Sequence, residues 1–361
     1  MEDKSTHLDD AAPEKLPIYM LKRPKPEDVP KNWEFIDYKV DDIDVGCYRA
    51  HAIGEPQSKI TMFSGFKADM ETYNTPQIRT LQRLGIEVDI ILLPDPGPHI
   101  GYLHDNKEIV RQALTEMPPP EGLKEGIPNF IFGHSLGGRA FIANMLDEDF
   151  AQEIHDNYAG AVLIAPHFSS PYRSTPVLNA LYNSYCKIFA KQAYGEAPLD
   201  WVFPATEKVR NFFSTGGKGE LRDDFEEKSK LTASPITPQN TATTHGQILY
   251  SNQEGEKLWE KIQKNGAPDA AKDFPIVMLG GSKDFVSSKN HIMGVAKEFD
   301  ADFYEFDTYH HPFLESKEAR KAILLMMRVM THDWTEINVP TEDALEEQER
   351  HHTGHTDHDL M

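Results

Sequence analysis

The sequence predicts an α/β protein whose central sheet is mostly parallel and covered by helices on both faces. Two observations support this fold class. Short apolar runs of strand length recur along the chain, as in Ile86–Leu93 and Ala161–Ala165, and buried parallel strands read as continuous apolar runs. Segments with apolar residues at helical spacing, such as Thr75–Leu84, separate these runs. Strands that alternate with helices in this way are typical of a parallel sheet.

The expected elements follow one another from Trp33 onward. Glu34–Val40 and Ile43–Ala50 are β-prone and nearly adjacent, which predicts a hairpin at the edge of the sheet. Asp95–Pro98 is expected to be a turn. The other expected strands are Lys59–Phe63, Ile86–Leu93, Phe130–Phe132, Ala161–Ala165, Pro275–Leu279 and Asp302–Phe306, and the expected helices are Thr75–Leu84, Asp105–Glu116, one after Ser135, and Lys317–Met330.

The interval between the strands at 161–165 and 275–279 predicts an inserted domain. Segment 169–270 is far too long for a single connection, and Val177–Tyr194 within it has a helical pattern. We therefore predict a lid at 169–270 inserted into a core formed by 31–168 and 271–335. Residues 1–30 are charged and rich in proline, and residues 336–361 are acidic and rich in histidine, so both are expected to be disordered.

The composition of the chain disfavours several kinds of partner, cofactor and location. The chain has 37 Lys and Arg against 58 Asp and Glu, a formal charge of −21, which disfavours nucleic acid and anionic membranes. Cys47 and Cys186 define neither a disulfide framework nor a metal site. No apolar run has transmembrane length, and the first residues are too polar for a signal peptide, so a cytoplasmic protein is expected. We predict no cofactor and no metal, and a solvated acidic tail is favoured over a metal site for His351, His352, His355 and His358.

A nucleophile elbow is indicated by the run Gly133-His134-Ser135-Leu136-Gly137-Gly138. The pattern Gly-x-Ser-x-Gly lies between an apolar strand and a helical segment. In such a turn the serine has a strained backbone that projects its hydroxyl from the sheet, and its neighbours two positions away fit only as glycine. The alternative, an ordinary glycine-rich turn, is disfavoured by this context. The motif predicts Ser135 as a catalytic nucleophile.

Candidate partners for the serine lie further along the chain. A serine hydroxyl needs a base within hydrogen-bonding reach, and after such an elbow an acid and then a histidine follow on loops at the carboxyl ends of strands. Asp284 follows the strand at 275–279, whereas Asp273 precedes it and would lie at the opposite edge of the sheet. After the strand at 302–306 come His310 and His311, and the residues alone leave that choice open.

Main-chain donors are expected to stabilise the anionic intermediate of an acyl-transfer reaction. One is the backbone N–H of the residue after the nucleophile, Leu136, and the other comes from the loop after Lys59–Phe63. That loop begins Ser64-Gly65-Phe66, which makes the Phe66 N–H the second candidate.

With these residues in place, the chain resembles the lysophospholipase and monoacylglycerol lipase branch of the α/β-hydrolases, which is also grouped with the serine aminopeptidases. The likeness covers roughly Trp33–Met330. It implies the α/β-hydrolase fold, with a mostly parallel central sheet, helices on both faces and an inserted helical lid. The family commonly has His-Gly before the oxyanion residue, and this chain has Ser64-Gly65 there. The matching segments are the elbow, the acid loop Gly281-Ser282-Lys283-Asp284 with Val286, and Leu231-Thr232 near the end of the lid.

The resemblance also implies which histidine is the base. In the family the catalytic histidine commonly precedes a glutamate by five positions, and His310 has this spacing to Glu315. His311 does not. The resemblance therefore implies Ser135, His310 and Asp284 as the catalytic set.

These residues predict a serine hydrolase that cleaves carboxylic esters through an acyl-enzyme intermediate. The resemblance implies monoacylglycerols or lysolipids as substrates. The aromatic residues of the lid are consistent with an acyl-chain or lysolipid pocket, and they could equally pack the lid onto the core. A thioester, an amide or a small soluble ester is an alternative substrate, and an inactive binding module is an alternative class of protein. The aromatic residues in question are Tyr182, Tyr185, Phe189, Tyr194, Trp201, Phe203, Phe212 and Phe213.

Overall fold

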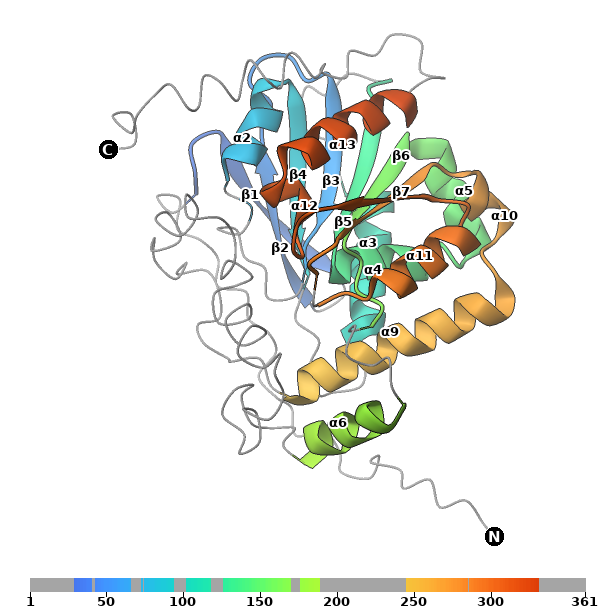
Figure 1. The fold of residues 1–361 in the computed structure, drawn as a ribbon. Coiled ribbons are helices and arrows are strands. Elements are labelled where there is room, and N and C mark those ends of the chain that lie inside the picture. The colour runs from blue at the N-terminus through green and yellow to red at the C-terminus, as the bar shows by residue number, and fades with distance from the viewer. Residues whose placement is uncertain are drawn as a thin grey trace.

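The computed structural model describes residues 29–40, 43–65, 73, 75–93, 102–117, 126–169, 176–188, 245–284 and 286–330. Within this part of the chain, the strands form one sheet in the order β1-β2-β4-β3-β5-β6-β7-β8 (Figure 1). The strands are β1 (Trp33–Val40), β2 (Ile43–Ala50), β3 (Ser58–Phe63), β4 (Ile86–Leu92), β5 (Asn129–His134), β6 (Gly160–Ile164), β7 (Ile276–Gly281) and β8 (Asp302–Phe306).

Two antiparallel pairings lie at one edge of an otherwise parallel sheet. β1 pairs with β2 over its whole length, from Trp33 opposite Ala50 to Val40 opposite Ile43, and β2 is antiparallel to β4. All pairings from β4 to β8 are parallel. The predicted edge hairpin and the mostly parallel sheet are therefore confirmed.

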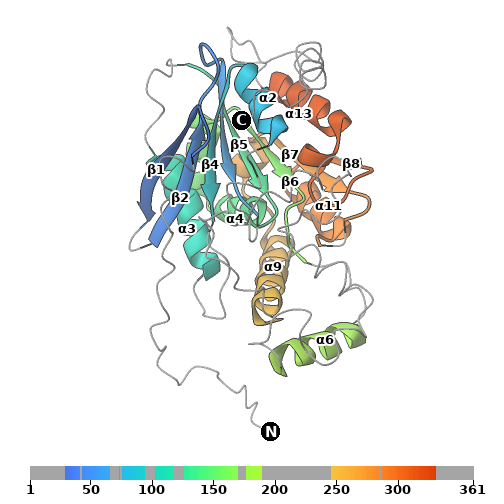
Figure 2. The same ribbon diagram turned by 90° about the vertical axis from the view of Figure 1, so that its left-hand side faces the viewer.

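Helices pack on both faces of this sheet. Two of them, α2 and α13, lie on one face with the short helix α12, and α3, α4, α5, α10 and α11 lie on the other (Figures 1 and 2). The helices are α2 (Pro76–Arg83), α3 (Tyr102–Thr115), α4 (Leu136–Asn144), α5 (Glu148–Asn157), α6 (Pro176–Ile188), α9 (His245–Asn265), α10 (Asp269–Asp273), α11 (Lys289–Glu298), α12 (Pro312–Glu315) and α13 (Lys317–Met330).

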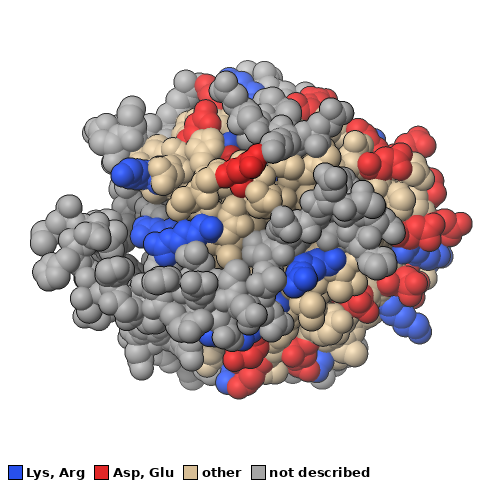
Figure 3. Space-filling view, turned by 90° about the horizontal axis from the view of Figure 1, so that it is seen from above, with Lys and Arg blue, Asp and Glu red and all other residues tan. Residues whose placement is uncertain are grey.

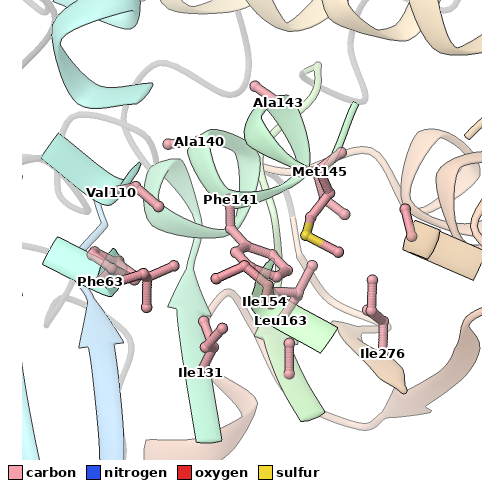
Figure 4. Close-up of a cluster of buried hydrophobic side chains, with 14 of the residues drawn as sticks. Phe63, Val110, Ile131, Ala140, Phe141, Ala143, Met145, Ile154, Leu163 and Ile276 are labelled. Atoms are coloured by element: carbon pink, nitrogen blue, oxygen red, sulfur yellow. The ribbon is translucent and has the colours of Figure 1, made fainter. Parts of the chain in front are cut away.

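Strand β5 lies at the centre of the core because its side chains are apolar on both faces. Phe130 and Phe132 pack into the cluster under α2 and α13, and Ile131 packs into the cluster under α3 and α4. Figure 4 shows the second cluster, in which Phe141 of α4 lies above the sheet near Leu163. The strand that leads to Ser135 is thus held from both sides.

Two helices lie beyond the carboxyl ends of the strands. Figures 1 and 2 show α9 next to the core and α6 farther from it. α9 packs closely, because a Cβ at Gly255 would overlap the main-chain oxygen of Phe168. Its residues Leu258 and Ile262 belong to the core cluster. Both helices fall within the predicted lid at 169–270, of which 170–175 and 189–244 lie outside the described residues. Residues 1–28, Asp95–Pro98 and the histidine-rich tail also lie outside them.

Charged side chains are also present inside the sheet. Asp89 on β4 is fully buried and accepts hydrogen bonds from Arg49 Nε at 2.6 Å and Nη2 at 3.0 Å, while Lys59 Nζ lies 2.9 Å from its Oδ2. Mutual pairing is what makes such buried charges tolerable. On the surface, acidic side chains are spread among basic and neutral ones over the face shown in Figure 3, in keeping with the acidic composition.

Candidate active site

The elbow places Ser135 on a strained turn between β5 and α4. Ser135 has φ +50° and ψ −108°, a conformation that is uncommon for any residue except glycine. Three main-chain hydrogen bonds hold it there. Its N–H donates to the Ile164 carbonyl at 2.9 Å, and its carbonyl accepts from the N–H groups of His167 at 3.0 Å and Arg139 at 3.1 Å. The strain is therefore compensated by contacts with β6 and α4.

The elbow glycines are required by close contacts. A Cβ at Gly133 would lie 2.7 Å from the Gly138 Cα, and a Cβ at Gly137 would lie 2.5 Å from the Phe63 carbonyl oxygen. The Gly137 N–H donates to the Ser64 carbonyl at 3.0 Å, which ties the start of α4 to the end of β3. The backbone thus approaches within distances that a side chain would prevent.

Asp284 and His310 form a hydrogen-bonded pair across the ends of two neighbouring parallel strands. His310 Nδ1 lies 2.9 Å from Asp284 Oδ2, and both side chains are only 3% exposed. The other carboxylate oxygen, Oδ1, accepts from the N–H groups of Val286 at 2.7 Å and Ser287 at 3.0 Å. Because a carboxylate only accepts, Nδ1 carries the proton and Nε2 is left as the basic nitrogen.

The loops that carry this pair are joined by main-chain contacts. Ser282 N–H donates to the Phe306 carbonyl at 2.8 Å, and Lys283 N–H donates to the Thr308 carbonyl at 2.9 Å. Gly281 permits this approach, since a Cβ there would overlap the Tyr309 carbonyl oxygen. β7 extends to Gly281, two residues beyond the predicted strand, because Gly280 and Gly281 still pair with β8.

His310 also lies beside the elbow. The ring of His134, the residue before Ser135, is 5.2 Å from the ring of His310 and 3.9 Å from that of His311, measured between centroids. Asp284 pairs with His310, whereas His311 stacks on His134 at an angle of 31°. The structure therefore brings Asp284, His310 and the segment carrying Ser135 together at the carboxyl ends of β5, β7 and β8.

The two other histidines are held neutral. Burial, followed by the neighbouring His310, lowers the pKa of His311 from 6.5 to about 3. Burial, followed by His311 and then His310, lowers the pKa of His134 well below its ordinary value. Two charged imidazoles are thereby avoided next to His310.

Of the two main-chain donors predicted for the anionic intermediate, one belongs to the described residues. Among the described residues, the Leu136 N–H at the start of α4 has no acceptor, as expected for a donor at the first position of a helix. Phe66, the second predicted donor, lies outside the described residues.

Sequence reasoning missed Tyr73, which contacts this region. Its hydroxyl accepts a hydrogen bond from the Gly65 N–H at 3.1 Å and lies 3.3 Å from His134 Nδ1. Tyr73 is fully buried, yet it belongs to a segment without apolar periodicity. Only its position between the ends of two strands reveals it.

Several solved structures are similar to this fold over most of the length of both chains. A soluble variant of monoglyceride lipase from Saccharomyces cerevisiae, solved with a substrate analog, has a TM-score of 0.54 at 16% identity, covering 86% of this chain and all of that one. A lipase in an open form has a TM-score of 0.53 at 14% identity, covering 83% of this chain and 99% of that one. The chain has the α/β-hydrolase fold.

This α/β-hydrolase fold is also shared with a hydrolase from Pseudomonas aeruginosa PA01, at a TM-score of 0.51 and 15% identity, covering 82% of this chain and 98% of that one. No protein-family model and no curated protein matches the sequence. At these identities the neighbours establish the fold, which confirms the predicted architecture. The chemistry must be argued from the site itself.

Within the described ranges, no group of three His, Cys, Asp or Glu side chains is placed to hold a metal ion. Among the same residues, no helix combines the length and the apolar character needed to cross a membrane.

Proposed function

We propose that this protein is a serine hydrolase that cleaves carboxylic esters through an acyl-enzyme intermediate. The observation that supports this most directly is the buried hydrogen bond between Asp284 and His310, formed beside a strained elbow that presents Ser135. A serine, an acid and an imidazole, in this chain order and at these strand ends, match the requirements of a catalytic triad.

Each residue has a defined role in the proposed reaction. The Ser135 oxygen attacks the ester carbonyl carbon while His310 Nε2 takes the hydroxyl proton. Asp284 keeps the His310 proton on Nδ1 and stabilises the imidazolium that forms. The Leu136 N–H, together with the Phe66 N–H, donates to the developing oxyanion.

Collapse of the tetrahedral intermediate then breaks the bond to the leaving alcohol, which takes the proton from His310. A water molecule, activated by the same imidazole, attacks the acyl-enzyme and releases the acid. The free serine is restored with its proton.

For the substrate, we propose monoacylglycerols or lysolipids. The resemblance of the elbow and acid loop to the lysophospholipase and monoacylglycerol lipase branch supports this class, as does structural similarity to a monoglyceride lipase solved with a substrate analog. Thioesters, amides and small soluble esters stay open as alternatives because one fold serves many substrates.

A serine-reactive fluorophosphonate tests the mechanism. Wild-type protein is expected to be labelled, and Ser135→Ala is expected to be unlabelled while keeping its circular dichroism spectrum. Absence of labelling in the folded wild type, or labelling that survives in the variant, contradicts the proposal and favours an inactive binding module. A chain-length series of p-nitrophenyl esters and monoacylglycerols tests the substrate class, since a lipid preference fails if long acyl chains gain nothing over acetate.

A further inference from the structure

A buried hydroxyl connects the two halves of the proposed oxyanion site. Tyr73 Oη lies 3.1 Å from the Gly65 nitrogen, at the end of β3, and 3.3 Å from His134 Nδ1, at the end of β5. Gly65 precedes Phe66, and His134 precedes Ser135 and Leu136. Each contact of the hydroxyl is thus one or two residues from a proposed oxyanion donor.

The direction of one of these hydrogen bonds follows from its chemistry. A main-chain N–H can only donate, so the Gly65 N–H donates to Tyr73 Oη. Between Tyr73 Oη and His134 Nδ1, the tautomer of the neutral imidazole sets which atom donates and which accepts. Burial and the adjacent histidines keep the pKa of His134 low, so the imidazole is uncharged at neutral pH.

The contact also removes one donor from consideration. Because its N–H is engaged by Tyr73, Gly65 is not free to donate to an oxyanion, which leaves the next residue along the loop for that role. The same segment is pressed against the elbow, since a Cβ at Gly65 would lie 2.7 Å from His134 Nδ1 and 3.3 Å from the Ser135 Cβ. A small displacement of Gly65 would therefore change its separation from the nucleophile.

We propose that Tyr73 and His134 are positioning residues that set the separation between Gly65, which follows β3, and the elbow, and so the geometry of the oxyanion site. Neither side chain contacts the reacting atoms in this scheme. The inference rests on the proposed serine hydrolase function, and it adds residues to that mechanism that the resemblance does not supply.

The test is the variant Tyr73→Phe, which keeps the buried ring and deletes only the bridging oxygen. Removing an oxyanion donor typically costs about 10²- to 10³-fold in kcat, and here the donor is displaced and not lost. We therefore expect kcat for p-nitrophenyl butyrate to fall about 10- to 100-fold, with KM changed less than about twofold because ground-state binding is untouched. The affinity for a trifluoromethyl ketone, whose adduct carries an oxyanion, should fall by the same factor as kcat/KM.

Tyr158→Phe is the matched control. Tyr158 is partly buried, and its hydroxyl donates to the Leu114 carbonyl at 2.8 Å, away from the site. The control loses one comparable hydrogen bond and should keep wild-type kcat and inhibitor affinity. Equal effects of the two substitutions would show a general loss of stability and overturn the proposal.

Three outcomes separate the hypotheses. If folded wild type hydrolyses no ester and is not labelled by a fluorophosphonate, the proposed function fails. If wild type is active and Tyr73→Phe keeps its kcat and inhibitor affinity, or changes KM alone, the positioning role fails. Should Tyr73→Phe not fold, His134→Gln tests the bridge from its other end, and unchanged kcat and inhibitor affinity in that variant overturn the role.

Discussion

Replacing Asp284 by asparagine tests how the proposed base is oriented, because the structure predicts which way the new amide would turn. Two main-chain N–H groups, from Val286 and Ser287, donate to Oδ1. The amide oxygen of the introduced asparagine must occupy that side, which leaves its NH₂ group facing His310 Nδ1. An NH₂ group donates, so Nδ1 would have to accept and the ring proton would move to Nε2. A His310 protonated on Nε2 cannot take the Ser135 proton.

The expected loss is therefore large in activity and small in stability. A base held in the wrong tautomer typically costs about 10⁴-fold in kcat, which corresponds to about 5.5 kcal/mol of transition-state stabilisation. All the hydrogen-bond positions around the side chain stay filled, so Asp284→Asn should lower the free energy of unfolding by only about 1 kcal/mol. Asp284→Ala should be as inactive but lose about 2–4 kcal/mol, because two buried N–H donors are left without an acceptor.

Steady-state hydrolysis of p-nitrophenyl butyrate and urea unfolding measure the two quantities separately. The reasoning is refuted if Asp284→Asn keeps kcat within about tenfold of wild type while folded. It is also refuted if the asparagine and alanine variants are equally unstable, since the difference between them comes only from the two main-chain donors.

Three further predictions concern stability. In urea unfolding, Gly137→Ala should lower the free energy of unfolding by at least about 3 kcal/mol, because its Cβ would lie 2.5 Å from the Phe63 carbonyl oxygen. The control Gly54→Ala, at a position with φ +97° and no described atom within 4 Å, should lower it by only about 1 kcal/mol. Arg139 is fully buried on α4, and burial lowers its pKa from 12.5 to about 10, which costs about 3 kcal/mol of folding stability at neutral pH. Because hydrogen bonds to Ser251 of α9 offset part of this cost, Arg139→Met should change the free energy of unfolding in urea by less than about 1 kcal/mol. A loss above about 3 kcal/mol would contradict this account. His311 has a pKa of about 3 in the folded state against 6.5 when unfolded, so between these values only the unfolded state binds its proton. The free energy of unfolding should therefore fall as pH drops below 6.5, by about 3 kcal/mol for this residue at about pH 4.5. A His311→Asn variant whose stability falls equally steeply from about pH 7 to 4.5 would refute the lowered pKa of His311.

The order of elements and the position of the elbow were predictable because they depend on local pattern. β5 and β6 are apolar on both faces, so they read as continuous runs whatever packs against them. The elbow glycines are fixed by main-chain contacts within a few residues or with the adjoining strand. Helices α5, α9 and α11 were missed as separate elements, since polar residues predominate on their exposed faces and weaken the pattern.

The sequence by itself determined the fold class, the turn that carries Ser135, and the two loops on which an acid and a histidine lie. Which histidine pairs with Asp284 was open from the residues, and the tertiary structure shows it through a distance of 2.9 Å to His310. The buried charges of Asp89, Arg49 and Lys59, and the bridge made by Tyr73, also appeared only in three dimensions. The physical reason is the same in each case: a polar side chain becomes tolerable in the core through a partner far away in the sequence, and no local pattern encodes that partner.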